Sequence, residues 1–287
     1  MFRVLCRVTD NAEERERIIK TPALRRIARI SLPELGIIRD IGGYMSAKDD
    51  VERATFAIGL TSIPLRKLDA KKEVISNASG CLVDYYGHRL LLSVSHKSLA
   101  DGNWAIEEGF DRDKGTRLHQ VGGLKYVARG DWGTLKRDAI DFSYASVPSD
   151  LVSLYQEIDA GRYTTKQAQR TVFKETFETE PNPKELYAFS GQTRHSKENW
   201  FLCSTNMVVM GLTFERSEGD FHHFKLPFRH PGHDSFHGCG GAPIIDSEAR
   251  VVALVCGGDT ETDTVYGVSL KKMKPILDIE TGRFVEA

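Results

Sequence analysis

The sequence contains no long apolar run. Nowhere in its 287 residues does an apolar stretch approach the ~18 residues that a membrane-spanning helix requires. Residues 1–10 also lack the apolar core and the small-residue cleavage site of a signal peptide. We therefore expect neither a membrane span nor a secretory signal, and no membrane partner.

Cysteine is also scarce, and an excess of either charge is missing. The five cysteines are an odd number, and without a targeting signal they predict reduced thiols in a cytoplasmic protein. The 39 Lys and Arg residues nearly balance the 40 Asp and Glu residues, which gives a formal net charge of −1. A dedicated nucleic-acid binder is usually strongly basic, so we expect no nucleic-acid partner.

Short apolar segments separated by glycine and aspartate turn signals fill most of the chain after residue 53. The clearest is a hairpin over residues 79–95, in which two apolar strands flank a turn at Gly87. Many short strands at such spacing predict an all-β barrel or sandwich. The other strands are expected at residues 54–63, 104–108, 117–121, 124–128 and 141–147 and, in a second series, at 185–190, 200–205, 207–214, 222–227, 242–246, 251–256 and 265–270.

Helical patterns lie at the two ends of the chain and in one internal segment. Asn11, with Glu14 three residues later, is a helix-start pattern, and it predicts an N-terminal helical extension over residues 1–50 that could dock a regulatory protein partner. The rest divides into a first β lobe at 51–148, a connector of helical or mixed character at 149–185, and a second β lobe at 186–287 that ends in a helix.

A glycine-rich turn in the second lobe carries the clearest chemical signal. Gly238, Gly240 and Gly241 surround Cys239, and such a turn can aim backbone amides at a reacting carbonyl. In the first lobe, His96 directly follows an apolar strand and is a candidate base. Asp141, which we prefer to Asp138 because a strand continues from it, is a candidate orienting carboxylate. A nucleophile, a base and a carboxylate are the parts of an acyl-transfer site.

Three segments resemble those of the trypsin-like (chymotrypsin-fold) peptidases. Residues 80–96 resemble the strand–turn–strand segment that ends in the catalytic histidine, residues 140–147 resemble the strand led by the aspartate, and residues 238–258 resemble the nucleophile loop and the substrate-binding strand. The resemblance covers roughly residues 53–275. It implies two six-stranded antiparallel β-barrels with a cleft between them, with His96 as base and Asp141 as its orienting acid, and it implies no cofactor.

The glycine-rich turn fits the family in two registers. In the first, Cys239 is the nucleophile, as in the chymotrypsin-fold cysteine proteases of RNA viruses, and the amides of His237 and Cys239 hold the oxyanion. This register predicts an endopeptidase, and an N-terminal extension that docks a partner could regulate it. In the second, Pro243 fixes the alignment, so Gly240 stands where the family has its nucleophile and Gly238 is the oxyanion glycine. That register predicts an inactive pseudo-peptidase that binds a peptide or protein partner.

The same resemblance suggests which residues contact a substrate. Cys256, Gly257 and Gly258 would pair with an extended substrate backbone. His233 and Asp234 fall near the primary specificity pocket, where Asp234 would favour a basic side chain and a histidine would hydrogen-bond a polar amide. The crowded residues His222, His223, His230, His233, His237 and Cys239 raise the alternative of zinc. Their spacing matches no zinc pattern, so we expect no metal.

Overall fold

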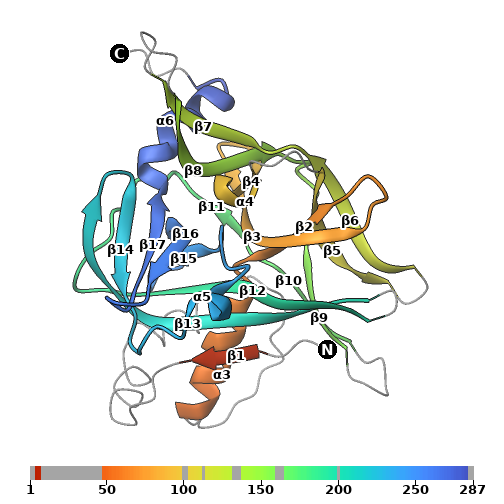
Figure 1. Cartoon of the computed structure of the whole chain (residues 1–287), viewed down its shortest axis with the longest axis horizontal. Helices are drawn as coiled ribbons and strands as arrows, with labels where there is room; N and C mark the ends of the chain where they lie inside the picture. Colours follow the sequence, from red (N-terminus) through yellow and green to blue (C-terminus); the bar gives the residue numbers. More distant parts are fainter. Residues whose placement is uncertain are drawn as a thin grey trace.

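The strands of the chain form two lobes (Figure 1). The computed structural model describes residues 4–7, 47–98, 103–111, 114–130, 137–158, 165–198 and 201–283. Neighbouring strands within each lobe are antiparallel, apart from two short strands that add in parallel. The predicted all-β class is therefore confirmed.

The first lobe is an 8-stranded sheet in which seven strands follow the order β6-β5-β2-β3-β4-β8-β7. The eighth, β11 (Val172–Lys174), pairs in parallel with β3. The hairpin predicted over residues 79–95 is present as β3 and β4, with Gly87 in the left-handed region at φ +86°. The strands are β2 (Ile63–Leu68), β3 (Val74–Tyr85), β4 (His88–Ser93), β5 (Asn103–Asp111), β6 (Gly115–Gly122), β7 (Lys125–Gly130) and β8 (Arg137–Ser146).

The second lobe closes into a barrel. Its strands follow the order β13-β12-β15-β16-β17-β14, and a further pairing between β13 and β14 completes the ring. The short β1 (Val4–Arg7) adds to β13 in parallel. The barrel strands are β12 (Leu186–Glu198), β13 (Phe201–Glu218), β14 (Phe221–Lys225), β15 (Pro243–Ile245), β16 (Val251–Asp259) and β17 (Thr264–Ser269). The expected C-terminal helix is present as α6 (Leu270–Glu280), which buries Leu270, Met273 and Leu277.

One apolar core joins the two lobes. Val94 and Phe142 of the first lobe belong to the same buried cluster as Val208 and Leu254 of the second lobe and Leu277 of α6. Burial of such a continuous apolar surface is the main favourable contribution to folding. The shared core therefore fixes the two lobes against each other, and with them the two sides of the cleft between them.

Two local predictions from the sequence are wrong. Residues 54–63 were expected to form a strand, but Ala47–Gly59 form the helix α3. The apolar residues Val51, Ala54 and Ile58 recur at helical spacing, and Ala54 and Ile58 are fully buried. The connector contains strands instead of helices within its described part, because β9 (Leu154–Ile158) and β10 (Thr165–Gln169) form an antiparallel pair.

Most of the predicted N-terminal helical extension, residues 8–46, lies outside the described residues. Within the described part of the extension, residues 4–7 form β1 and residues 47–50 begin α3. A regulatory partner for residues 1–50 stays a prediction. Over the residues that the structure describes, no helix has both the length and the apolar character needed to cross a membrane.

Candidate functional site

His96 and Asp141 lie together in the first lobe. His96 belongs to the short helix α4 (Ser95–Ser98) that follows β4, and Asp141 lies on the neighbouring strand β8. The Asp141 carboxylate accepts two hydrogen bonds from His96, one from the backbone amide at 2.8 Å and one from ring atom Nδ1 at 2.7 Å. A neutral His96 ring that donates from Nδ1 leaves Nε2 as a proton acceptor, which is the arrangement of a general base.

The electrostatics of Asp141 support this tautomer. Burial alone would raise the pKa of the Asp141 carboxyl group, but the hydrogen bonds and charge of His96 outweigh burial and hold the pKa below its ordinary value. Ser95 Oγ adds a contact at 3.2 Å from Asp141 Oδ1. Asp141 is therefore an ionised acceptor at neutral pH, and it fixes the orientation of the His96 ring.

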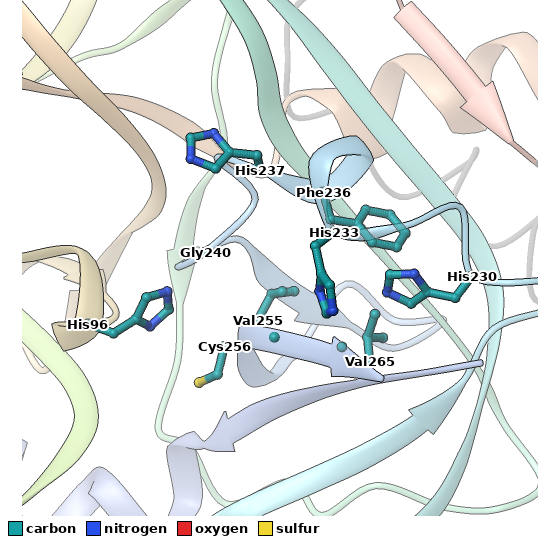
Figure 2. Close-up of a pocket in the computed structure, with 11 residues that line it drawn as sticks. His96, His230, His233, Phe236, His237, Gly240, Val255, Cys256 and Val265 are labelled. Carbon is teal, nitrogen blue, oxygen red and sulfur yellow. The ribbon is translucent and has the colours of Figure 1, made fainter. Parts of the chain in front are cut away.

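Gly240 occupies the position that faces the base. A Cβ atom placed on Gly240 would lie 3.4 Å from both Nε2 and Cε1 of His96 and 3.3 Å from Val94 Cγ2. Figure 2 shows the backbone of Gly240 beside the His96 ring. A serine or cysteine at position 240 would project its nucleophilic atom toward Nε2.

Cys239 points elsewhere. It is fully buried in the apolar cluster of the second barrel with Phe189 and Val252. Its side chain lies against β12, since a Cβ atom added to Gly191 would meet Cys239 Sγ at 2.7 Å. Burial raises the pKa of the Cys239 thiol to about 12. The structure brings His96 and Asp141 together, and it does not bring the Cys239 sulfur to them.

Some backbone amides of the glycine-rich turn have an acceptor within the turn, and others do not. The His237 amide donates to the Asp234 carbonyl at 3.4 Å, and the Cys239 amide donates to the Phe236 carbonyl at 2.9 Å. Those were the oxyanion donors expected in the register with Cys239 as nucleophile, and both are engaged within the turn. The amides of Gly238 and Gly240 donate to no acceptor within the described part of the chain. These two amides are therefore the candidates for binding an incoming oxygen.

Ser79 of the first lobe holds the turn in place. Its Oγ donates to the Gly238 carbonyl at 2.8 Å and accepts from the Gln192 amide at 2.9 Å, while its own amide donates to the Gly240 carbonyl at 2.9 Å. Gly241, at φ +88°, lies so close that an added Cβ would sit 2.1 Å from the Ser79 carbonyl oxygen. Sequence reasoning missed Ser79, because nothing in an apolar hairpin marks one serine as the partner of a turn about 160 residues away.

A pocket of about 170 Å³ opens beside His96 and Gly240 (Figure 2). The end of β16 lines it through Cys256, Gly257 and Gly258, three of the expected substrate-binding residues. Cys256 points toward Asp141, and its Sγ lies 3.7 Å from the Asp141 carbonyl oxygen. The other lining residues include His230, His233, Phe236, His237 and Val265, of which Val265 lies on the neighbouring strand β17 and pairs with Gly258.

Of the two residues expected near the specificity pocket, only one lines it. His233 lines the pocket, whereas Asp234, one residue later in α5 (His233–Phe236), is exposed and is not among the lining residues. His230 is 7% exposed and lines the pocket; the sequence pointed to it only as one of several crowded histidines. Among the described residues, no group of three His, Cys, Asp or Glu side chains is arranged to hold a metal ion.

No protein-family model matches this chain, and no curated protein matches it. Solved structures do match. GrC is 9% identical, with a TM-score of 0.50 over 78% of this chain and 95% of that one. A serine endoprotease from Yersinia pestis is 9% identical, with a TM-score of 0.47 over 84% of this chain and 69% of that one. The catalytically active tobacco etch virus protease complexed with product is 12% identical, with a TM-score of 0.45 over 79% of this chain and 80% of that one. The chain has the chymotrypsin-like fold, and likeness at this identity shows the fold alone.

Proposed function

We propose that this chain is a chymotrypsin-fold pseudo-peptidase, which binds an extended peptide segment of a partner protein in its cleft without hydrolysing it. The observation that carries the proposal is the position of Gly240, whose missing side chain would lie 3.4 Å from His96 Nε2. Covalent acyl transfer needs a nucleophilic atom within reach of the base. Glycine supplies none.

Cys239 is poorly suited to replace that nucleophile. Its thiol is buried among apolar side chains, and this burial raises its pKa to about 12 and so disfavours the thiolate that would attack. To attack a carbonyl in the cleft, the sulfur would have to leave its contact with Gly191 and the backbone of the turn would have to rotate. The hydrogen bonds that Ser79 makes to the carbonyls of Gly238 and Gly240 oppose this rotation.

The binding parts of the cleft are retained. The amides of Gly238 and Gly240, which have no acceptor among the described residues, would donate to a carbonyl or carboxylate oxygen of the peptide. β15 pairs with β16 only as far as Leu254, so that edge of β16 has no strand partner at residues 256–258 within the described part of the chain. An extended peptide can add to such an edge through backbone hydrogen bonds, with one of its side chains in the pocket of Figure 2.

Replacing Gly240 with serine tests the proposal. Gly240 does not have a left-handed φ, and the nearest contacts of an added Cβ, at 3.3–3.4 Å, are all with side-chain atoms, so the backbone can accept a side chain. We expect the wild type to hydrolyse no peptide and to resist a serine-directed fluorophosphonate probe. We expect Gly240→Ser to react with that probe about 10²–10⁴-fold faster than the Gly240→Ser/His96→Ala double variant, the factor that a positioned base supplies.

Two results would contradict the pseudo-peptidase proposal. If the wild type cleaves peptides, or if an electrophilic peptide probe labels Cys239 at a rate that falls in His96→Ala, the chain is an endopeptidase with Cys239 as nucleophile. Cys239→Ala is the matched control: our proposal expects it to leave peptide binding unchanged, whereas an active cysteine peptidase would lose hydrolysis completely.

A further inference from the structure

We propose that the cleft recognises the free C-terminal end of a protein chain, with the terminal carboxylate held between the amides of Gly238 and Gly240 and the ring of His96. This inference builds on the proposed function, because it names the part of the partner protein that the cleft binds. It depends on the space that the missing side chain of Gly240 leaves open. Figure 2 shows His96 and Gly240 together at one end of the pocket, with His230 at the other.

The donors for the first carboxylate oxygen are the amides of Gly238 and Gly240. Both glycines are buried, and neither amide has an acceptor among the described residues. Buried backbone N–H groups nearly always have a partner, so an oxygen of a ligand would satisfy these two. The Gly240 amide is held in its direction, because the carbonyl of the same peptide group, that of Cys239, accepts from the Ala242 amide at 2.9 Å.

The place for the second oxygen is beside His96 Nε2. A Cβ atom on Gly240 would lie 3.4 Å from Nε2, and a nucleophilic side chain would project further toward the ring. Because glycine has no side chain, a second oxygen can come within hydrogen-bonding distance of Nε2 while the first stays on the amides. The side chain of His96 is 40% exposed, so a ligand can reach it. An internal peptide carbonyl has one oxygen and cannot make both contacts.

The charges at this end of the pocket favour a carboxylate. The ionised Asp141 carboxylate on Nδ1 stabilises the protonated ring of His96, which donates from Nε2. Burial and Asp141 raise the pKa of the Cys256 thiol well above its ordinary value, so this neighbour is uncharged at neutral pH. Among the described residues, no Asp or Glu lines the pocket. A carboxylate therefore gains a charge-assisted hydrogen bond. The other titratable residues that line the pocket are His230, His233 and His237.

The residues that precede the terminus have a place on β16. Along the described chain, β15 pairs with β16 only as far as Leu254, so residues 256–258 offer a free strand edge to an extended peptide. The same residues line the pocket together with Gly240, and the last side chain of the peptide can enter it. The volume of about 170 Å³ is below the ~300 Å³ at which pockets for whole drug-sized ligands begin, and it fits one side chain.

The experiment measures peptide binding to the full-length wild type. A library of hexapeptides, fluorescently labelled at the N-terminus and free at the C-terminus, would be screened by anisotropy. The best binder is then remade as its C-terminal amide, and again with three alanines added after its last residue. We expect the free acid to bind about 10–100-fold more tightly than either, the factor of a hydrogen bond between charged groups. His96→Ala should abolish this preference. His88→Ala, which alters an exposed histidine of β4 outside the pocket, is the control and should keep it.

Proton uptake gives a second readout, which a purely structural role of His96 would not move. Isothermal titration calorimetry at pH 7.5 in buffers of different ionisation enthalpy measures it. We expect the free acid to bind with uptake of a proton, because the carboxylate needs the protonated His96 ring as its donor. The amide peptide should bind the wild type without uptake, and the free acid should bind His96→Ala without uptake.

The possible failures can be told apart. Equal affinity for the three peptides, a preference that survives His96→Ala, or binding of the acid without proton uptake overturns the inference, and the proposed function still stands. Mass spectrometry of the alanine-extended peptide after incubation tests the proposed function itself. If the wild type cuts this peptide, or if no peptide binds in any form, the proposed function fails and the inference fails with it.

Discussion

At the scale of single residues, the His96–Asp141 pair retains its hydrogen bonds although Gly240 offers no hydroxyl beside it. The two hydrogen bonds from His96 and its charge hold the pKa of Asp141 below its ordinary value despite burial. A carboxyl group with a lowered folded-state pKa contributes stability above its unfolded pKa, and this contribution is lost as the pH falls through the folded value. Asp141 should therefore contribute to stability at neutral pH and not in strong acid.

This contribution can be measured with Asp141→Asn. We expect the difference in free energy of unfolding between wild type and Asp141→Asn to be larger at pH 7 than at pH 3, as followed by urea denaturation at both values. Asp150→Asn, which alters an exposed carboxylate, should show no such pH dependence. A difference of equal size at both pH values would mean that the ionised form of Asp141 has no special stabilising contact.

The sequence identified the base and the carboxylate of the site, but it left two alternatives for the residue at the nucleophile position. His96 and Asp141 could be singled out because each stands at the edge of a recognisable strand. The choice between Cys239 and Gly240 could not be made, because glycine permits several backbone paths through the turn. The backbone path of the turn depends on tertiary contacts, with Ser79 on one side of the turn and Gly191 against the cysteine. Neither partner is close to the turn in sequence.

At the scale of elements, strands were predictable where alternation or apolar runs were clear, as in the β3–β4 hairpin and in β16. The segment at 54–63 was misassigned because a short apolar run fits a buried helix as well as a strand. The decisive pattern begins earlier, at Val51, and packs against the core through Ala54 and Ile58. The connector strands β9 and β10 pair mainly with each other, and their mixed polar sequence gave no strong period.

The strand β3 does more than complete a sheet, since Ser79 on it positions the turn of the other lobe. Ser79→Ala removes one donor and one acceptor and leaves the Gly238 carbonyl and the Gln192 amide without that partner in a buried place. We expect a loss of about 1–3 kcal/mol in the free energy of unfolding, measured by urea denaturation. We also expect weaker peptide binding, because the Gly238 amide is no longer fixed.

The matched control lies on the same strand. Ser76 is only partly buried, and Ser76→Ala should change stability by less than about 0.5 kcal/mol, as is usual for surface substitutions. If Ser79→Ala were as mild as Ser76→Ala, the turn would be held by its own backbone hydrogen bonds, and the first lobe would have no part in shaping the site.

At the scale of the whole molecule, the cleft depends on how firmly the two lobes are joined. The shared apolar core contributes to that connection, and buried polar contacts add to it, those of Ser79 and one that involves the C-terminal helix. Tyr85, at the end of β3, donates its hydroxyl to Asp278 of α6 at 2.5 Å. Burial and the carboxylate together raise the pKa of the Tyr85 hydroxyl above its ordinary value, so it remains a donor throughout the neutral range. The C-terminal helix thereby fastens to the first lobe although its chain belongs to the second.

Tyr85→Phe tests how strongly this contact joins the lobes. The variant keeps the ring that stacks on Phe177 and removes only the donor to a charged acceptor, so we expect a loss of about 1.5–3 kcal/mol in the free energy of unfolding. Tyr86→Phe is the control, since Tyr86 is 42% exposed and its ring contact with Arg283 survives. Because the core is continuous, tryptophan fluorescence and circular dichroism should follow one common transition in both variants. Two separate transitions in Tyr85→Phe would mean that the lobes unfold independently, and that peptide binding across the cleft would have to hold them together.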